Sequence, residues 1–487
     1  MRPLFLRLSL LLALAPFVLL MAFNQPFFDD FRLAYWTRDY GFWGMQKWFY
    51  LYQSGRFTST VFMTALNPVT YGWLGGVKLV VAVIFVLQWA SIAFFLRTLF
   101  HLALRMACSW ATATWTAALL LALLCNAAPS PFSLLYWFCA TIAYQIPLIS
   151  LLSFATLAMR AGWGPTHWQW RCAGLACVPL VLALAGNELL LVQAVPTLAL
   201  LGYLLPRAAR PKLWLWLAVG ALATTATIIA PGNWLRLVAS APPTDALHAY
   251  RWLALLPRTA YSAALFLIQP LIGLSLLAAA ATGLWLGFRQ PPTAGVPVAL
   301  SPRQWRAVLL AFVILNGIGF LLFRYIFVGA PLLRAQNEIL LVMLISVAAL
   351  AWVAAQRLPT VATWKPFLLR NGRVMALILA GLFGAGNVPA AWRELLASAA
   401  PYNAQMQARF AALRAAHLAH VPGVVLPPLH LPYGRILSPM RKPNNRIEFD
   451  VDLTTGCEGN INGVMERYFE VPDVCCSPDA PSLPPHQ

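Results

Sequence analysis

Long apolar runs constrain this chain more than any other feature of its sequence. A helix needs about 20 mainly apolar residues to cross about 30 Å of hydrocarbon. Eleven stretches approach that requirement, at residues 5–23, 75–96, 111–128, 134–158, 172–187, 189–205, 213–230, 260–287, 307–328, 338–356 and 373–391. We therefore predict an all-α polytopic membrane protein with about eleven transmembrane helices.

The charge content supports this class of protein. Only 10% of the residues are charged, whereas soluble domains carry about 25%. This composition excludes a disordered chain, a disulfide scaffold and a cytosolic enzyme. The net charge of +19 would suggest nucleic acid on a soluble protein, but in a membrane protein an excess of Lys and Arg records topology. We expect the lipid bilayer as a partner and no nucleic acid.

The positions of the charges predict the orientation. With the N-terminus in the cytoplasm, the inside segments are 1–7, 97–110, 159–171, 206–212, 288–306 and 357–372, and they contain Lys and Arg but no acid. The positive-inside rule favours this arrangement. Reading residues 172–205 as one helix would give ten spans and would place Asp245 inside. We retain eleven, with the C-terminus in the periplasm of a bacterial inner membrane.

The first apolar segment resembles a signal peptide in its basic start and short apolar stretch. No small-x-small cleavage site follows it, so we expect an uncleaved anchor.

Two large regions lie outside the membrane under this topology. The first is the loop 24–74. The second is the tail, residues 392–487, which follows the transmembrane part, residues 1–391. Residues 392–420 have helical periodicity, and 421–450 are Pro-rich and expected to be extended. We expect a compact segment at 451–472 and a disordered end from Ser477 to Gln487. One helix face would carry Leu395, Leu396, Met406, Phe410 and Leu413.

Cysteines are expected to play two roles. In an oxidising compartment Cys457 can pair with Cys475 or Cys476. The others are most simply packing residues in or near membrane helices, namely Cys108, Cys125, Cys139, Cys172 and Cys177.

The first outer loop contains the most informative residues. Asp29 and Asp30 emerge directly after the first span, where a partly buried carboxylate can act as a general base, or where the pair can bind a metal. The alternative is a helix cap. Phe42, Met45, Phe49 and Tyr52 share a helical face, which predicts a helix lying in the membrane interface. Arg56, within Ser54-Gly55-Arg56-Phe57, can clamp a phosphate.

Further polar groups lie on the same side of the predicted bundle. They are Asn187 and Glu188 after Gly186, Asn233 and Arg236 after Pro231-Gly232, Arg334 with Asn337 and Glu338, and an aromatic patch from Tyr136-Trp137 to Tyr144. Each has an ordinary structural explanation as a cap, a turn or a snorkelling side chain. Their common side is the stronger indication of function. The sequence has no Walker-type loop and neither an HExxH nor a serine-hydrolase motif.

In order and side, these stretches resemble the bacterial GT-C type membrane glycosyltransferases, in particular glucosyltransferase-like proteins that decorate surface polysaccharide. The resemblance covers the whole membrane part and, more loosely, the tail from Asp450 to Phe469. It rests on Asp29-Asp30-Phe31, Ser54-Gly55-Arg56-Phe57, Tyr136-Trp137 with Tyr144, Gly186-Asn187-Glu188, Pro231-Gly232-Asn233 with Arg236, and Arg334 with Asn337.

The resemblance implies a GT-C-like bundle that transfers a sugar from a polyprenyl-phosphate donor to an extracytoplasmic glycan or lipid acceptor by a single inverting displacement. Asp29 or Asp30 would be the base. The groups implied at the substrate and its phosphate are Arg56, Arg236, Arg334, Glu188, Asn187, Asn233 and Asn337. Arginines, or a divalent metal (Mg²⁺ or Mn²⁺) at the two aspartates, would neutralise the leaving phosphate.

Two other functions stay open. A transporter or flippase for a lipid-linked glycan would use the same arginines without covalent chemistry, but it would need polar or broken helices along a path through the membrane. An envelope assembly protein would act through its tail and would not need the loop acids.

The topology is directly testable. A reporter that is active only in the periplasm should be active when it is fused after residue 400, because the eleven-helix map places that position outside. An inactive fusion would contradict the map.

Overall fold

The structure is a computed structural model. It describes residues 3–240, 248–289, 301–327, 330–358, 361, 363–429, 436–438, 453 and 456–480. Nearly all regular structure is helical. The main helices are α1 (Pro3–Leu20), α2 (Phe28–Trp48), α3 (Phe57–Ala65), α4 (Gly76–Thr98), α5 (Trp110–Ala127), α6 (Phe138–Trp163), α7 (Thr166–Leu184), α8 (Glu188–Leu204), α9 (Arg210–Ile228), α10 (Pro231–Ser240), α11 (His248–Leu267), α12 (Pro270–Arg289), α13 (Pro302–Phe327), α14 (Leu333–Arg357), α16 (Lys365–Arg370), α17 (Gly372–Phe383), α18 (Asn387–Ala397), α19 (Ala399–Leu418) and α20 (Asn460–Phe469). Short 3₁₀ turns cover Met21–Phe23, Pro68–Tyr71 and Arg207–Ala209, and π turns cover Phe49–Gln53, Leu99–Ala103 and Phe132–Tyr136; the two strands are β1 (Gly423–Leu426) and β2 (Asp473–Cys476).

Seven helices in the described residues are long and apolar enough to cross a membrane: Phe5–Phe23, Gly76–Ala103, Trp110–Ala127, Phe138–Trp163, Pro270–Arg289, Pro302–Ile326 and Leu333–Gln356. An eighth is formed if Arg207–Ile228 and Pro231–Val238, which meet at a bend of 48°, are one broken span. The prediction of an all-α, multi-pass membrane protein is therefore supported by the fold, and the count of eleven spans stays a prediction.

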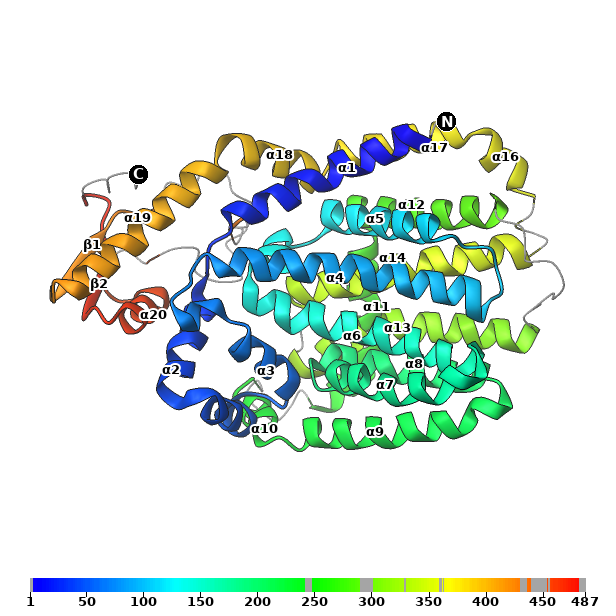
Figure 1. The fold of residues 1–487 in the computed structure, drawn as a ribbon, viewed down its shortest axis with the longest axis horizontal. Helices are drawn as coiled ribbons and strands as arrows, with labels where there is room; N and C mark the ends of the chain where they lie inside the picture. Colours follow the sequence, from blue (N-terminus) through cyan, green and yellow to red (C-terminus); the bar gives the residue numbers. More distant parts are fainter. Residues whose placement is uncertain are drawn as a thin grey trace.

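The apolar helices lie side by side in one elongated bundle, and α2, α3, α10 and the C-terminal elements gather at one of its ends (Figure 1). Glycines allow the closest helix contacts. A Cβ atom on Gly283 would lie 2.3 Å from the Ala348 carbonyl oxygen, and one on Gly287 would lie 2.6 Å from that of Trp352. The Gly-x-x-x-Gly spacing in α12 thus lets α14 pack backbone against backbone.

Two expected spans are interrupted. The segment 260–287 is divided between α11 and α12, because residues 268–269 are not helical. They lie just before Pro270, and the ring of a proline disfavours the helical conformation of the residue that precedes it. The segment 373–391 is divided between α17 and α18, where Gly386 has a φ of 84°. The single continuous helices predicted there are therefore wrong.

The break at 185–187 agrees with the prediction of two helices, α7 and α8, in place of one. Gly186 is required there, since a Cβ atom would lie 2.3 Å from Cγ of Pro147 in α6. Asn187 then caps α8, with its side-chain oxygen accepting from the Leu190 N–H at 2.9 Å. A tight turn and a polar cap together end one helix and begin the next.

The aromatic loop helix differs from its prediction. Helix α2 contains a non-helical Gly41 with a φ of 67°, so the chain changes direction before the aromatic run. Met45 is buried, Phe42 and Phe49 are half-buried, and Trp43 is 79% exposed. Phe42, Met45 and Phe49 of the predicted interfacial face therefore pack at least partly against the protein, whereas Tyr52, the fourth member of that face, is 58% exposed.

The tail forms a small unit whose strands pair in parallel, with Gly423 opposite Asp473. The single helix predicted for 392–420 is interrupted at Ser398. Leu396 is exposed, although Met406, Phe410 and Leu413 are buried as expected. Of the predicted Pro-rich extension, 430–435 and 439–450 lie outside the described residues, as do 481–487 of the expected disordered end.

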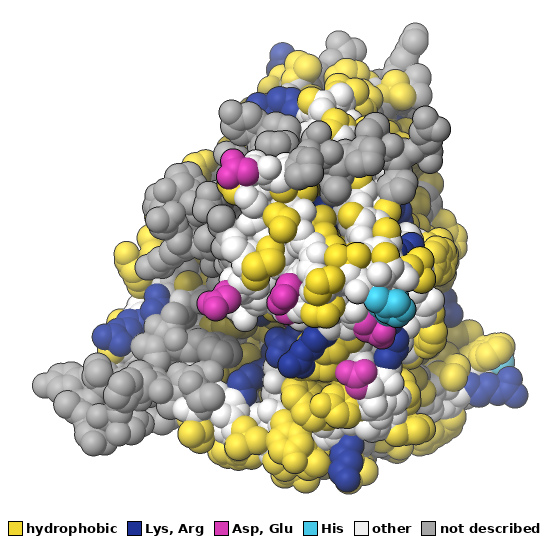
Figure 2. Space-filling view, turned by 90° about the vertical axis from the view of Figure 1, so that its left-hand side faces the viewer, with side chains coloured by type: hydrophobic (Ala, Val, Ile, Leu, Met, Phe, Trp, Pro, Cys, Tyr) yellow, Lys and Arg dark blue, Asp and Glu magenta, His cyan; other side chains and the backbone are white. Residues whose placement is uncertain are grey.

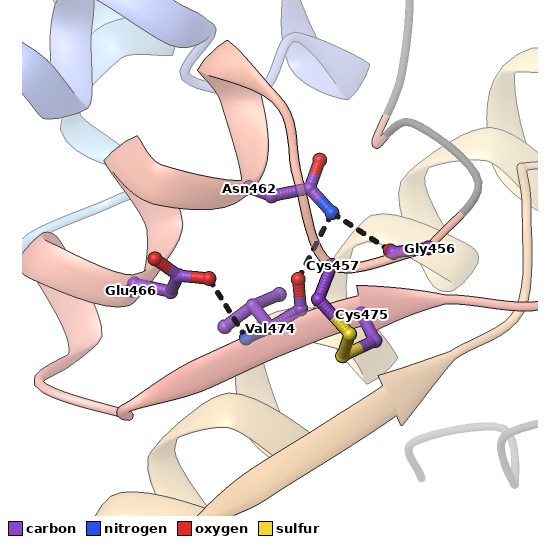
Figure 3. The surroundings of a disulfide bond; sticks show 6 residues. All are labelled: Gly456, Cys457, Asn462, Glu466, Val474 and Cys475. Atoms are coloured by element: carbon purple, nitrogen blue, oxygen red, sulfur yellow. Dashed lines mark hydrogen bonds between the residues drawn. A yellow bond between two sulfur atoms is a disulfide. The ribbon is translucent and has the colours of Figure 1, made fainter.

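A disulfide joins Cys457 to Cys475 (Figure 3), and the buried Cys476 is not part of it. This is one of the two pairings that the sequence allowed. Asn462 supports the bridge region from α20, because its side-chain nitrogen donates to the carbonyl oxygens of Gly456 at 3.3 Å and Val474 at 2.9 Å.

Asn126 should hold the broken helix pair α17–α18 to the bundle. Its side chain is fully buried, donates to the Leu382 carbonyl at 2.9 Å and accepts from the Val388 N–H at 3.1 Å. A buried backbone group that loses its hydrogen-bond partner costs about 1–3 kcal/mol. Asn126→Ala should therefore lower the free energy of unfolding, measured on the protein in detergent micelles, by about 2–4 kcal/mol. Asn371→Ala, at an exposed amide that bonds only to the Phe367 carbonyl, is the control and should change stability little.

Candidate functional site

Three chain breaks meet at the end of the bundle that carries α2, α3 and α10. The loop before α3 contacts the start of α10, since a Cβ atom on Gly232 would lie 2.5 Å from the Gln53 nitrogen. The same loop contacts the α9 terminus, because a Cβ atom on Gly55 would lie 2.1 Å from the Thr227 carbonyl oxygen. Glycine is needed where backbones approach this closely. The separately noted Ser-Gly-Arg and Pro-Gly-Asn motifs are thus packed together.

The turn between α7 and α8 joins this contact from the other side. The Ser59 hydroxyl donates to the Gly186 carbonyl at 2.7 Å, and the Thr58 N–H donates to the Ala185 carbonyl at 3.2 Å. Because α3 is anchored to this turn, Arg56 at its start lies beside Glu188 at the start of α8.

Glu188 is shared by two arginines. The Arg56 Nε donates to Oε2 of Glu188 at 2.6 Å, and Arg236 Nη2 lies 2.8 Å from its Oε1. These three side chains are 22–33% exposed. Burial tends to lower the pKa of Arg56, but the adjacent Glu188 carboxylate outweighs it and raises that pKa above its usual range. Two guanidinium groups paired with one carboxylate leave one net positive charge, so the cluster can bind an anion.

Arg334 connects this cluster to the aromatic patch. Its Nε donates to the Tyr144 hydroxyl at 3.3 Å, and its guanidinium lies 5.5 Å from the ring centre of Trp137. Tyr144 also acts on Arg56 by charge and hydrogen bonding. The arginines predicted from α3, α10 and α14 therefore belong to one polar network, in which Tyr144 lies between Arg56 and Arg334.

The two adjacent aspartates have different environments. Asp30 is fully buried, with Oδ2 accepting from the Phe27 N–H at 2.9 Å and Oδ1 from the Cys139 N–H at 3.0 Å. It closes the first turn of α2 and ties it to α6. Burial is the largest influence and raises the pKa of Asp30 to about 7, although a hydrogen bond from the Cys139 side chain and the two backbone hydrogen bonds act in the opposite direction.

Asp29 is half-buried and, in the part of the chain that the structure describes, has neither a hydrogen bond nor a salt bridge. Burial raises the pKa of Asp29, while the charges of Arg32 and Arg334 partly oppose that rise. The sequence did not single out Arg32, whose guanidinium lies 4.4 Å from the ring centre of Trp36. Of the two aspartates, Asp29 has a carboxylate available to a substrate.

The three predicted asparagines make hydrogen bonds within the protein. Asn233 joins the Gly55 N–H to the Thr227 carbonyl, and Asn337 bonds both backbone groups of Ser130. The Asn187 amide donates to Oε2 of Glu338 at 3.2 Å. The structure thus gives them framework contacts. Glu338 itself is fully buried, and its Oε1 has no partner among the described residues.

The described residues contain no group of three or more His, Cys, Asp or Glu side chains placed to hold a metal ion. Both carboxylate oxygens of Asp30 accept backbone hydrogen bonds. A divalent metal at Asp29 would therefore depend largely on ligands from the substrate.

Figure 2 shows the end of the molecule that carries this network. Acidic and basic side chains occur together in the middle of this face, and hydrophobic side chains cover much of its lower part. Beside the network, Trp234, Leu235 and Val238 of α10 are exposed apolar side chains. In comparisons with known proteins, no family model matches the chain and no curated protein is significantly similar to it.

The raised pKa of Asp30 predicts a pH-dependent stability. A carboxyl whose pKa rises from 3.8 to about 7 on folding favours the fold in its protonated form, so its contribution is complete at low pH and is lost as the pH rises through about 7. Thermal unfolding in detergent should therefore show a fall in stability between pH 5 and pH 8. Asp30→Asn cannot ionise and should be less stable at pH 5 but have a flatter profile. Equal slopes in the two proteins would contradict this account.

Proposed function

We propose that the protein is a membrane glycosyltransferase that transfers a sugar from a polyprenyl-phosphate donor to an extracytoplasmic acceptor. The observation that carries the proposal is the Asp29 carboxylate, which makes no hydrogen bond or salt bridge within the described residues and is acted on by the charges of Arg32 and Arg334. Arg334 connects it through Tyr144 to the Arg56–Glu188–Arg236 cluster. The resemblance of the motifs to GT-C type glycosyltransferases supports the same activity. The bilayer supplies the lipid-linked donor, and the site faces the periplasm.

In this mechanism Asp29 accepts the proton of the acceptor hydroxyl. The acceptor oxygen attacks the anomeric carbon, the bond from that carbon to the phosphate oxygen breaks, and the configuration inverts. The proton stays on Asp29, and the lipid phosphate leaves with an added negative charge. A carboxylate with a raised pKa is a better proton acceptor.

The departing phosphate requires positive charge that is already in place. The charge of Arg334 acts on Asp29, and Arg56 and Arg236 together exceed the charge of Glu188 by one. Glu188 holds the two guanidiniums in a fixed geometry, which lowers the cost of ordering them around a phosphate. The asparagines support the loops that hold these arginines.

The main alternative is a transporter or flippase for a lipid-linked glycan. Two buried polar groups inside the bundle bond to neighbouring helices: Gln193 donates to the Leu315 carbonyl at 3.3 Å, and Asn316 donates to the Ser346 hydroxyl at 3.2 Å. Their hydrogen bonds join helices, which is a structural role. The charged network lies at one end, and this favours chemistry there over passage through the membrane.

The decisive experiment supplies the purified protein with radiolabelled polyprenyl-phosphate sugars and a lipid acceptor and measures sugar transfer. Asp29→Asn should lower the transfer rate by about 10²–10⁴-fold, because an amide cannot accept the proton. Arg56→Gln should weaken use of the donor, seen as a raised KM.

Asp39→Asn is the matched control, because Asp39 is an exposed carboxylate in the same helix. Its transfer rate should equal that of the parent. Full activity in Asp29→Asn would exclude Asp29 as the base. Failure of the parent to consume any polyprenyl-phosphate sugar, while it moves the intact lipid between leaflets, would favour the flippase.

A further inference from the structure

Helix α10 has two faces of opposite character. Gly232, Asn233 and Arg236 lie toward the protein, and Trp234, Leu235 and Val238 lie outward at the same spacing. The chain enters α10 directly from α9 through a bend of 48°. Such a division between an apolar and a polar side is typical of helices at a boundary between two media.

All three residues of the inward face, Gly232, Asn233 and Arg236, contact the site. Gly232 permits contact with the backbone of Gln53 and Ser54, the Asn233 side-chain oxygen accepts from the Gly55 N–H at 2.9 Å, and Arg236 binds Glu188. The position of α10 therefore sets the position of Arg236.

The outward face of α10 is apolar and exposed. Val238 is 75% exposed and Trp234 57% exposed. This surface continues that of α9, where Leu222, Ile228 and Ile229 are also exposed. Since α9 belongs to the membrane bundle, the medium that covers its outer face extends over α10.

The length of α10 decides how it meets the bilayer. Its 10 residues span about 15 Å, which is half of the hydrocarbon thickness. It cannot cross, but a short helix with Trp on its apolar side is suited to the boundary between headgroups and acyl chains. Insertion would cover the exposed apolar side chains and leave Arg236 at headgroup level.

We propose that α10 is an interfacial helix whose outer face enters the outer leaflet, and that it thereby holds the Arg56–Glu188–Arg236 cluster at the depth of lipid phosphates. The occupant of the outer face is the phospholipid leaflet. The cluster takes its anion sideways from that leaflet as the phosphate of a lipid. This extends the proposed function by assigning the direction from which a lipid-linked donor enters.

The first test measures depth and needs no enzymatic activity. Val238→Cys is labelled with an environment-sensitive fluorophore in phosphatidylcholine vesicles that contain a doxyl-labelled quencher lipid. Leu418→Cys is the control, because Leu418 is 77% exposed at the end of α19. The parent, with its own free cysteines, gives the background.

We expect strong quenching at position 238 and little at position 418. Quenching at 238 no greater than at 418 would overturn the proposal. This outcome would leave the transfer assay unaffected, so the failure of the entry route and the failure of the proposed activity are distinguishable.

The second test measures whether the phosphate of a membrane lipid binds the arginines of the cluster. A photoactivatable phosphatidic acid, which is a lipid with a terminal phosphate, should crosslink near α10 in the parent, and Arg236→Gln should reduce the yield by about tenfold. Crosslinking by photoactivatable phosphatidylcholine should be the same in both proteins. Inorganic phosphate at equal concentration should not compete if the leaflet supplies the anion. Equal yields from parent and Arg236→Gln, or full competition by inorganic phosphate, would overturn the sideways route.

Discussion

The functional end of this protein depends on one carboxylate shared by two arginines. Glu188 starts α8, Arg56 precedes α3, and Arg236 lies on α10, so a single side chain joins three helices from distant parts of the sequence. Partly desolvated charges are stable only when they are paired with good geometry. Without Glu188 the two guanidiniums would repel each other, and the docking of α10 on the loop before α3 would rest on glycine packing and on the Asn233 hydrogen bonds.

The neighbouring aspartates show how one helix start can serve two purposes. Successive residues of a helix point about 100° apart, so Asp29 and Asp30 cannot share an environment. Asp30 lies inward and accepts two backbone N–H groups, while Asp29 lies toward Arg334. The structural function of Asp30 gives Asp29 a fixed backbone position. The cap and the catalytic candidate, which the sequence left as alternatives, are adjacent residues.

The sequence predicted the class of fold and singled out many residues of the candidate site, because both inferences depend on patterns that do not require exact helix boundaries. Long apolar runs require helices in lipid, and few acids are present, so Asp29, Asp30 and Glu188 were easily singled out. The breaks at Pro270 and Gly386 were missed because their flanking residues remain apolar, and hydropathy does not register backbone conformation. The burial of Met45 within the predicted face of Phe42, Met45, Phe49 and Tyr52 was missed because apolar periodicity does not distinguish lipid from protein as the partner. The Cys139 N–H bond to Asp30 spans 109 residues and has no local signal.

The location of the site at helix ends has a physical reason. Inside the bilayer a charged cluster would have to desolvate fully, whereas at the starts of α3 and α8, with Arg236 of α10, the same groups remain 22–33% exposed. A lipid phosphate meets the same constraint, since its chain must remain in hydrocarbon while its charge remains at the boundary. In the proposed arrangement, the Arg56–Glu188–Arg236 cluster satisfies both requirements, because the exposed apolar side chains of α10 lie beside it. That match between the boundary position of the cluster and the boundary position of a lipid phosphate is what connects the fold to the proposed chemistry.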